Sequence, residues 1–405
     1  MRERTIGIAY DCLFPFTTGG GERLYRSYAS QMAERGLAVE YLTAVQWPAS
    51  TPPEQPEMRV VPVVGRLRLY DEGGVRRTPA ALLYASGLFR SLLTRRRNYR
   101  AVVVGGLPVL NVFAARAALI GSGTHVVIDY LEVWGRRQWV DYAGTVTGSI
   151  AWMLQKLAIK ITPTATCHSQ LTAAQLRKEG FRGRLLVSPG LIDGDSATAF
   201  SPSASSPPFV LYAGRHIPDK RVEALPAAVA RARQDIPELR LVVLGTGPSS
   251  REVDRSIDDA GARAWTEQPG FVDEYRLTEL FTDAAVLVNP SRREGYGLVV
   301  VEASAHGTPV VLVADPGNAA TELIDAGVNG FIARSATPED LGTAIVDAVK
   351  GGEALRSLTR SWYEEALRTR TVERTVDALL AAIGVPTQAS PAADPPSADT
   401  PEGPL

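Results

Sequence analysis

Short apolar runs alternate with amphipathic helical stretches along the chain, and this alternation limits the possible folds more than any other feature. The strand-like runs of the first half are TIGIAY, VEYLTA, MRVVPVV, AVVVGG and HVVIDY, at 5–10, 39–44, 58–64, 101–106 and 125–130. Strands separated by helices favour a parallel sheet covered on both faces. The alternation begins again at FVLYAG (209–214), after a Ser/Pro-rich stretch. The pattern predicts an α/β chain with two doubly wound, Rossmann-like domains.

The length of the chain agrees with two domains. Its 405 residues exceed the size at which a single core usually keeps growing. We expect a first Rossmann-like domain over 1–200, a linker over 201–208 and a second Rossmann-like domain over 209–360. A helix over 361–385 is expected to pack back toward the first domain, and the Pro/Ala/Ser-rich tail 386–405 to be disordered. Because open parallel sheets bind ligands at the carboxyl ends of their strands, two facing domains predict a cleft.

Charge and composition exclude several kinds of partner. The formal net charge of -1 gives no electrostatic reason to expect nucleic acid. The two cysteines and four scattered histidines lack the spacing of a metal site, so neither a metal nor a resident cofactor is expected. No run approaches the ~18 apolar residues of a bilayer span, and the charged start MRER predicts no signal peptide. A cytoplasmic location follows as the expectation.

A basic motif follows the first strand of the second half. Arg215 and Lys220 lie in GRHIPDK, directly after a predicted strand and at a predicted helix start. Two cations beside exposed helix N–H groups suit a diphosphate, since arginine can bind two phosphate oxygens at once. The alternative interpretation is a solvated helix start.

Glycines and a valine follow the next two strands. Gly245 and Gly247 end the first of these strands, where glycine permits close approach of a ligand. Val272 follows the second, which is short.

Two glutamates flank a Gly-rich turn in SRREGYGLVVVEA. Glu294 precedes the turn, a helix is predicted to start near Gly297, and Glu302 lies within that helix after four apolar residues. A carboxylate in apolar surroundings needs hydrogen-bond partners, which the two hydroxyls of a ribose would provide. The alternative for Glu302 is a cap or a pair with a nearby arginine. Turn N–H groups in front of a helix dipole are suited to phosphate.

The run REGYGLVVVEASAHGTPVV resembles the Glu-x7-Glu signature of the family-4 retaining glycosyltransferases. GRHIPDK, LVVLGTGP, PGFVDEYRLTELFTDAAVLVNPS and ATELIDAGVNGFIA also resemble that family in order and spacing. The first half is similar through FTTGGGERLY and LLVSPGLID (185–193). The resemblance implies the GT-B fold, in which two Rossmann-like domains face each other across a cleft. It also implies that the domain over 1–200 lies on the acceptor side and that the domain over 209–360 binds the nucleotide sugar. It also implies metal-independent transfer of a sugar from a nucleoside diphosphate to an acceptor, with retention of anomeric configuration.

The resemblance also implies roles for individual residues. Glu294 is implied to contact the donor sugar, Arg215 and Lys220 to neutralise the diphosphate, and Glu302 to hold the ribose. Val272 is implied to meet the base, and the loop Gly19 to Gly21 to approach the phosphates from the opposite domain. The donor-binding positions implied in this way are Gly20, Gly21, Gly214, Gly245, Gly247, Val272, Gly295, Tyr296, Gly297, Leu298 and Glu302.

One departure from the family affects the acceptor side. Many relatives carry a histidine near the fourth strand of the first domain, where this chain reads DYLEVWG (129–135). Asp129 or Glu132 could supply the polar group there, or Asp129 could cap a strand end. The acceptor therefore stays unidentified, with a natural product, a polysaccharide and a glycolipid as candidates. The donor base and sugar also stay open.

Other functions and contacts were weighed against glycosyl transfer. A sugar-nucleotide epimerase and a non-catalytic nucleotide-binding subunit are the alternatives, and the spacing of GGGE does not support a nicotinamide dehydrogenase. The basic run 90–100 could contact an anionic membrane, but a solvated helix end is the favoured interpretation. The stretch 145–161 is interpreted as a core helix, and His168 and His306 as structural.

Overall fold

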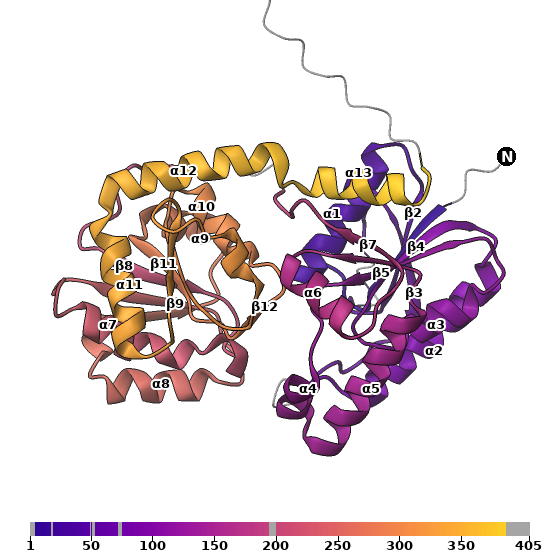
Figure 1. Ribbon diagram of the computed structural model, residues 1–405, viewed down its shortest axis with the longest axis horizontal. Coiled ribbons are helices and arrows are strands. Elements are labelled where there is room, and N and C mark those ends of the chain that lie inside the picture. Colours follow the sequence, from indigo (N-terminus) through magenta and orange to yellow (C-terminus); the bar gives the residue numbers. More distant parts are fainter. Residues whose placement is uncertain are drawn as a thin grey trace, which may run out of the picture.

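Two parallel sheets, each covered by helices, lie side by side in the computed structural model (Figure 1). The structure describes residues 5–17, 19–48, 50, 53–71, 75–193 and 200–385, so the predicted tail at 386–405 lies outside the described residues. The two doubly wound units confirm the expected α/β fold class.

The first sheet has seven parallel strands in the order β3-β2-β1-β4-β5-β6-β7. Its strands are β1 Thr5–Ala9, β2 Val39–Ala44, β3 Arg59–Val64, β4 Tyr99–Gly105, β5 His125–Tyr130, β6 Thr164–Cys167 and β7 Arg184–Val187. The helices of this half are α1 Gly20–Glu34, α2 Thr78–Arg95, α3 Leu110–Ala118, α4 Arg136–Ala143, α5 Thr145–Ile161 and α6 Gln170–Lys178. The order reverses direction at β1, so ligands are expected beside β1 and β4 at their carboxyl ends.

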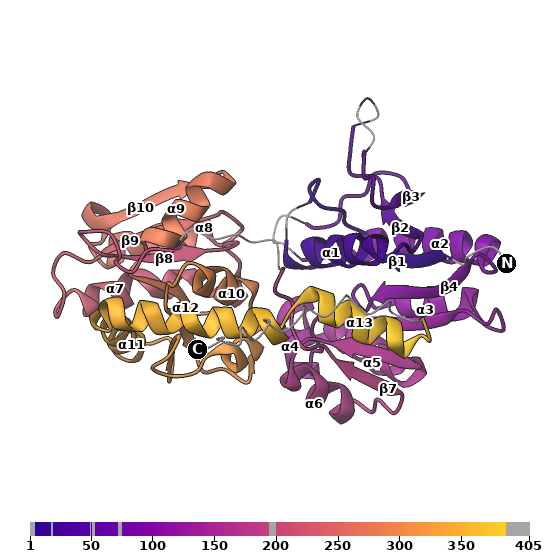
Figure 2. The same cartoon turned by 90° about the horizontal axis from the view of Figure 1, so that it is seen from above.

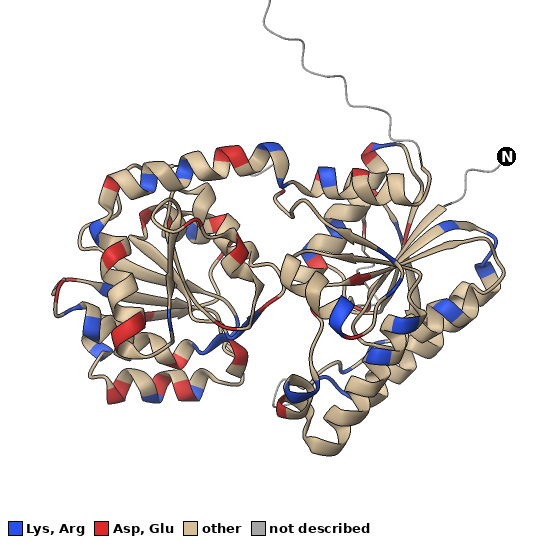
Figure 3. Ribbon diagram, in the orientation of Figure 1, with Lys and Arg blue, Asp and Glu red and all other residues tan. Residues whose placement is uncertain are grey.

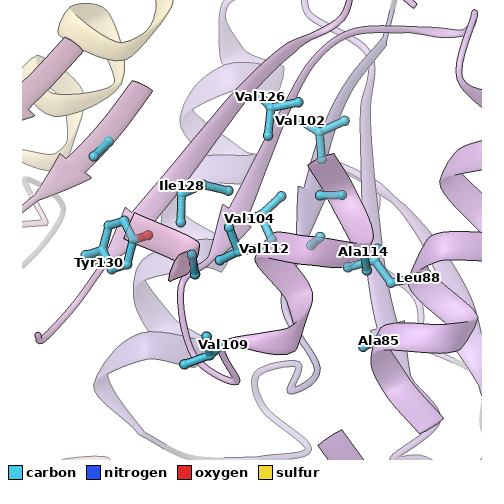
Figure 4. Close-up of a cluster of buried hydrophobic side chains, with 14 of the residues drawn as sticks. Ala85, Leu88, Val102, Val104, Val109, Val112, Ala114, Val126, Ile128 and Tyr130 are labelled. Carbon is cyan, nitrogen blue, oxygen red and sulfur yellow. The ribbon is translucent and has the colours of Figure 1, made fainter. Parts of the chain in front are cut away.

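Strand β4 shows how the apolar runs build two layers of core. Val102 and Val104 enter the cluster beneath α2 and α3, which Figure 4 shows, whereas Ala101 and Val103 enter the cluster beneath α1. Successive side chains of a strand point to opposite faces, so a strand buried on both faces needs a continuous apolar run. The sequence AVVV meets that requirement.

The second sheet has six parallel strands in the order β10-β9-β8-β11-β13-β15. Its strands are β8 Phe209–Ala213, β9 Arg240–Leu244, β10 Thr266–Gly270, β11 Val286–Asn289, β13 Val310–Val313 and β15 Gly330–Ala333. The helices are α7 Leu225–Ala232, α8 Ser250–Asp259, α9 Glu274–Asp283, α10 Leu298–Ala305 and α11 Pro338–Lys350. A small ladder joins β12 Arg293–Glu294 to β14 Gly317–Asn318.

Two C-terminal helices connect the units. Helix α12 (Gly352–Thr369) packs on α10, and α13 (Val372–Ala382) packs on α1 of the first unit (Figures 1 and 2). Arg35, the residue that follows α1, contacts Asp377 of α13 at 2.9 Å. The chain thus crosses between the units a second time, after the first crossing that follows β7.

Local structure differs from the sequence prediction at three places. The predicted helix 219–235 is two short 3-10 turns, Pro218–Lys220 and Val222–Ala224, followed by α7. Gly20 and Gly21 form the first turn of α1 instead of a loop before it. Helix α5 buries only one face, so the interpretation of 145–161 as a core helix is half correct.

Candidate active site between the two sheets

A cavity of about 430 Å³ lies between the carboxyl edges of the two sheets. The first unit contributes Gly19 to Leu24 and the loop after β5. The second unit contributes the loop after β8 and residues of the segment from Glu294 to Glu302. The parallel strands of both sheets end there, so loops distant in sequence converge on one space.

Two helices begin at this cavity from opposite sides. Helix α1 starts at Gly20 and α10 starts at Leu298, and a Cβ on Gly20 would lie 3.2 Å from Leu298 Cδ1. Gly297 precedes α10 with a φ of 105°, a left-handed conformation that glycine adopts without strain. Helix N-termini present free N–H groups and positive partial charge. The facing helix starts make the cavity attractive to an anion.

Glu294 is held at the cavity wall by three donors that share one oxygen. Lys220 Nζ, Asn289 Nδ2 at 2.9 Å and Ser291 Oγ at 2.8 Å all donate to Oε1. Burial raises the pKa of the Glu294 carboxyl, but the Lys220 charge and these hydrogen bonds outweigh it, so the pKa lies below its usual value. Within the described part of the chain, Oε2 has no hydrogen-bond donor, which leaves it available to a ligand.

Glu302 is reached from the opposite unit. Arg23 of α1 donates to Glu302 Oε1 at 2.5 Å across the cavity, and both side chains are partly exposed. The arginine alternative raised from the sequence is therefore realised, with a partner 279 positions away in sequence. This contact occupies one of the two carboxylate oxygens of Glu302.

Arg215 and Lys220 both line the cavity from the loop after β8. Lys220 pairs with Glu294. The exposed Arg215 guanidinium has no acidic partner among the residues that the structure describes. An unpaired cation beside two helix starts is suited to phosphate oxygens.

The two carboxylates weighed for the acceptor side are placed differently. Glu132 lines the cavity and accepts from Trp134 Nε1 at 2.7 Å. Burial raises its pKa, and the nearby Glu294 charge adds to the increase. Asp129 lies near the carboxyl end of β5, is fully buried and does not line the cavity, and Tyr25 and Thr166 donate to it. Of the two carboxylates, only Glu132 therefore reaches the cavity wall directly.

Histidine does occur at the cavity, from a strand that the sequence did not single out. His168 follows β6, lines the cavity and is 3% exposed. Its Nε2 lies 3.0 Å from Asp129 Oδ1 and its Nδ1 lies 2.9 Å from Ser188 Oγ. The His168 charge and hydrogen bond help to lower the pKa of Asp129 against the effect of burial. The hydrogen bond to Ser188 and the contact with Asp129 hold the ring at the cavity wall.

Several predicted donor positions support the cavity without lining it. Gly214, Gly245, Gly247 and Val272 are outside its wall, whereas Gly20, Gly21, Gly295, Tyr296, Gly297 and Leu298 belong to it. A Cβ on Gly245 would lie 2.1 Å from Gly214 O, and one on Gly247 2.3 Å from His216 O. These glycines allow the loops after β8 and β9 to touch. Their requirement for glycine comes from backbone packing.

Sequence reasoning missed the partners that orient the glutamates. Asn289 and Ser291 precede Glu294 closely enough for their short polar side chains to be found by inspection. Arg23 gives no local signal, because only the approach of the two units brings it to Glu302. Arg293 binds Asp219 and lies over the Trp134 ring at 4.1 Å, another contact that needs both units.

Two family profiles match the chain in series. A Glycosyl transferase 4-like domain matches residues 19–190, and Glycosyl transferases group 1 matches residues 195–365. This chain belongs to the family-4 glycosyltransferases. A D-inositol 3-phosphate glycosyltransferase from Segniliparus rotundus is 31% identical over 199 residues, which are 46% of this chain and 42% of that relative. The alignment thus spans less than half of the curated relative.

Solved structures share the fold across the whole described molecule. Sucrose-phosphate synthase from Thermosynechococcus elongatus matches with a TM-score of 0.71 and 18% identity, over 94% of this chain and 96% of that one. Anabaena HepE in complex with UDP and glucose matches with a TM-score of 0.70 and 17% identity, over 94% and 99% of the two chains. The expected GT-B fold of this family-4 chain is confirmed.

Proposed function

We propose that this family-4 glycosyltransferase moves a sugar from a nucleoside diphosphate donor to an acceptor, with retention of anomeric configuration and without a metal ion. The observation that carries the proposal is the cavity itself. Around a volume of about 430 Å³, it combines two facing helix starts with three cations and four glutamates, which are Arg23, Arg215, Lys220, Glu22, Glu132, Glu294 and Glu302. That size suits a small ligand of nucleotide-sugar class.

The diphosphate would lie where positive charge is concentrated. Arg215 and Lys220 would bind its oxygens, and the N-termini of α1 and α10 would add N–H donors. As the nucleoside diphosphate departs, negative charge builds on those oxygens. Groups fixed in advance stabilise such charge without reorganising. These side chains would then supply what a metal ion supplies in other transferases.

The two glutamates would hold the sugars at either end of the diphosphate. The free Oε2 of Glu294 would accept from hydroxyl groups of the donor sugar, while Oε1 stays bound to its three donors. Glu302 would accept from the ribose hydroxyls once Arg23 is displaced. Arg23 would then be free to turn toward the phosphates from the first unit.

The acceptor would approach from the side of Glu132. A carboxyl group with a raised pKa is a stronger base than an ordinary glutamate, and Glu132 lies on the cavity wall near Glu294. It would orient the acceptor hydroxyl while that oxygen attacks the anomeric carbon from the face of the departing phosphate. The departing phosphate would help to take the acceptor proton.

The proposal is tested by ligand binding and product analysis. UDP, GDP, TDP and ADP, each with its sugar conjugates, are screened by thermal shift, and the selected pair is measured by calorimetry. Binding to the folded form raises the midpoint by mass action. Hydrolysis of the donor is then followed by proton NMR. A free sugar of unchanged anomeric configuration is expected, whereas an isomerised nucleotide sugar would identify an epimerase.

A variant separates an enzyme from a silent nucleotide-binding subunit. Glu294→Ala should abolish donor hydrolysis while the far-ultraviolet circular dichroism is unchanged. If folded wild-type protein binds none of the four nucleotides, glycosyl transfer from a nucleoside diphosphate is refuted.

A further inference from the structure

Two carboxylates on the first unit's part of the cavity wall have no cation paired with them. Acidic and basic segments both lie where the two units face each other, so the charges must be assigned one by one (Figure 3). Most of the charged side chains of the wall are joined in two ion pairs, Arg23 with Glu302 and Lys220 with Glu294. Glu22 and Glu132 line the same cavity and have no ion-pair partner within the part of the chain that the structure describes.

Glu22 is the more enclosed of these two carboxylates. It lies in the first turn of α1, where the helix start stabilises a negative charge. Only 8% of the residue is exposed, and its carboxylate lies beside Gly19. A buried carboxylate is costly unless it is paired. Since no described residue pairs with Glu22, a ligand in the cavity is the remaining source of positive charge.

Two tyrosine rings flank Glu22 on this part of the wall. Tyr10 and Tyr70 line the cavity, and burial raises the pKa of both phenols, with the Glu22 charge adding to the increase. Arg76 lies over the Tyr70 ring at 5.4 Å, but it is bound to Asp11 and is not part of the wall. Aromatic rings attract ammonium groups. A carboxylate between two such rings is suited to an organic amine.

The donor makes a positive charge on the acceptor more favourable. Under the proposed function, the diphosphate binds Arg215, which is the remaining unpaired arginine or lysine among the described residues of the wall. The diphosphate also adds negative charge of its own. Glu22 and Glu132 are then left without compensation. An anionic acceptor would be repelled by this part of the cavity, whereas a cationic one would be attracted.

We infer that the acceptor carries a protonated amino group, which Glu22 binds between the rings of Tyr10 and Tyr70. The inference rests on the proposed function and names the class of its acceptor, an amino sugar or an aminocyclitol. A protonated amine is not a nucleophile, so a hydroxyl of the same molecule reacts, oriented by Glu132. Its oxygen bonds to the anomeric carbon as the bond from that carbon to the diphosphate breaks. The hydroxyl proton passes to the departing phosphate.

Acceptors that differ only in charge test the inference. The selected sugar nucleotide is incubated with glucosamine, galactosamine and 2-deoxystreptamine, each beside its N-acetylated form, and with glucose 6-phosphate. Products are measured by mass spectrometry. At least one free amine should be used with a kcat/KM about ten-fold or more above that of its N-acetylated form and of the phosphate.

The outcomes distinguish this inference from the proposed function. Equal use of the free and N-acetylated amines, or a preference for glucose 6-phosphate, overturns the inference. Donor hydrolysis without transfer to any of the three amines also overturns it, while the proposed function stands. If the folded wild-type protein binds no nucleotide and hydrolyses no donor, the proposed function itself is refuted.

A matched pair of variants tests whether Glu22 recognises the amine. Glu22→Gln keeps the shape and removes the charge, so the preference for the free over the N-acetylated amine should fall below about three-fold, mainly through a higher KM for the amine. Both acceptors meet the same protein sample, so partial unfolding or weaker donor binding cancels in this ratio. Glu179→Gln is the control, since Glu179 is 9% exposed and accepts from Trp152 Nε1 at 3.1 Å outside the cavity wall. An unchanged preference in Glu22→Gln, or an equal fall in Glu179→Gln, removes Glu22 from the amine.

The contribution of the aromatic ring has its own comparison. Tyr70→Leu should lower the same preference by about three-fold, because the ring that attracts the ammonium group is lost. Tyr70→Phe keeps the ring and should leave the preference unchanged. Equal losses in the two variants would assign the effect to the hydroxyl group and overturn the role of the ring.

Discussion

Replacement of Glu294 by glutamine separates sugar binding from nucleotide binding. Three donors converge on Oε1, whereas Oε2 has no donor among the described residues. Glutamine keeps the shape and one acceptor oxygen but removes the charge. The changed group is one that we assign to the donor sugar and not to the diphosphate or the base.

The size of the effect follows from the loss of charge. A hydrogen bond to a charged group contributes about 1.5–3 kcal/mol and a neutral one about 0.5–1.5. Losing this difference at one sugar hydroxyl predicts roughly a five- to ten-fold rise in the Kd of the sugar nucleotide. The Kd of the nucleoside diphosphate alone should change by less than about two-fold. The free energy of unfolding should fall by about 1–3 kcal/mol because the Lys220 pair becomes uncharged on one side.

The stability effect has a defined pH dependence. The pKa of Glu294 is lowered in the folded state by Lys220 and its other donors, which outweigh the opposing effect of burial. Its charge therefore stabilises the fold at pH values above the unfolded pKa of about 4.3, and the contribution is lost as the pH falls through the folded pKa. The difference in unfolding free energy between wild type and Glu294→Gln should be largest near neutral pH and shrink in acid.

Glu40→Gln provides a matched control. Glu40 has the same side-chain exposure of 13% and is held by Arg95 at 2.9 Å and Tyr99 at 2.6 Å, outside the cavity. It should lose comparable stability without altering either Kd. Calorimetric titrations with the selected nucleoside diphosphate and its sugar conjugate provide the comparison. If Glu294→Gln changes both affinities equally, or resembles Glu40→Gln in both, our assignment of Glu294 to the sugar is refuted.

Three further changes probe other parts of the molecule. Gly297→Ala should cost about 2–4 kcal/mol in urea unfolding, because its φ is 105° and a Cβ would lie 2.5 Å from Ala320 Cβ, whereas Gly36→Ala, with open space around it, should cost no more than about 2. Arg356→Met should cost about 3–5 kcal/mol, since the buried guanidinium donates to four backbone carbonyls; a loss below 1 would contradict this. Glu302→Gln should reduce the preference for a ribonucleotide over its 2′-deoxy form from about ten-fold to below three-fold in competition binding, and an unchanged preference would remove Glu302 from the ribose.

Much of the cavity's second-unit wall could be predicted from the sequence because its signals are local. Glu294, Gly297 and Glu302 lie within one strand–turn–helix segment, so their spacing alone places them near one helix start. Arg215 and Lys220 share one short loop for the same reason. Gly245 and Gly247 were also identified from the sequence. A side chain at either position would clash with the backbone of the neighbouring loop, and the spacing of the motif does not reveal that constraint.

The sequence by itself determined the two parallel sheets, because a strand buried on both faces requires an uninterrupted apolar run and each helix between them an apolar stripe. Only the tertiary structure decided which groups meet across the cavity. Arg23 reaches Glu302, Glu132 faces the Glu294 loop while Asp129 is buried, and the apolar stripe of α5 faces outward. Such contacts depend on how two separately patterned units pack together. The positions of the partners along the chain do not indicate that packing.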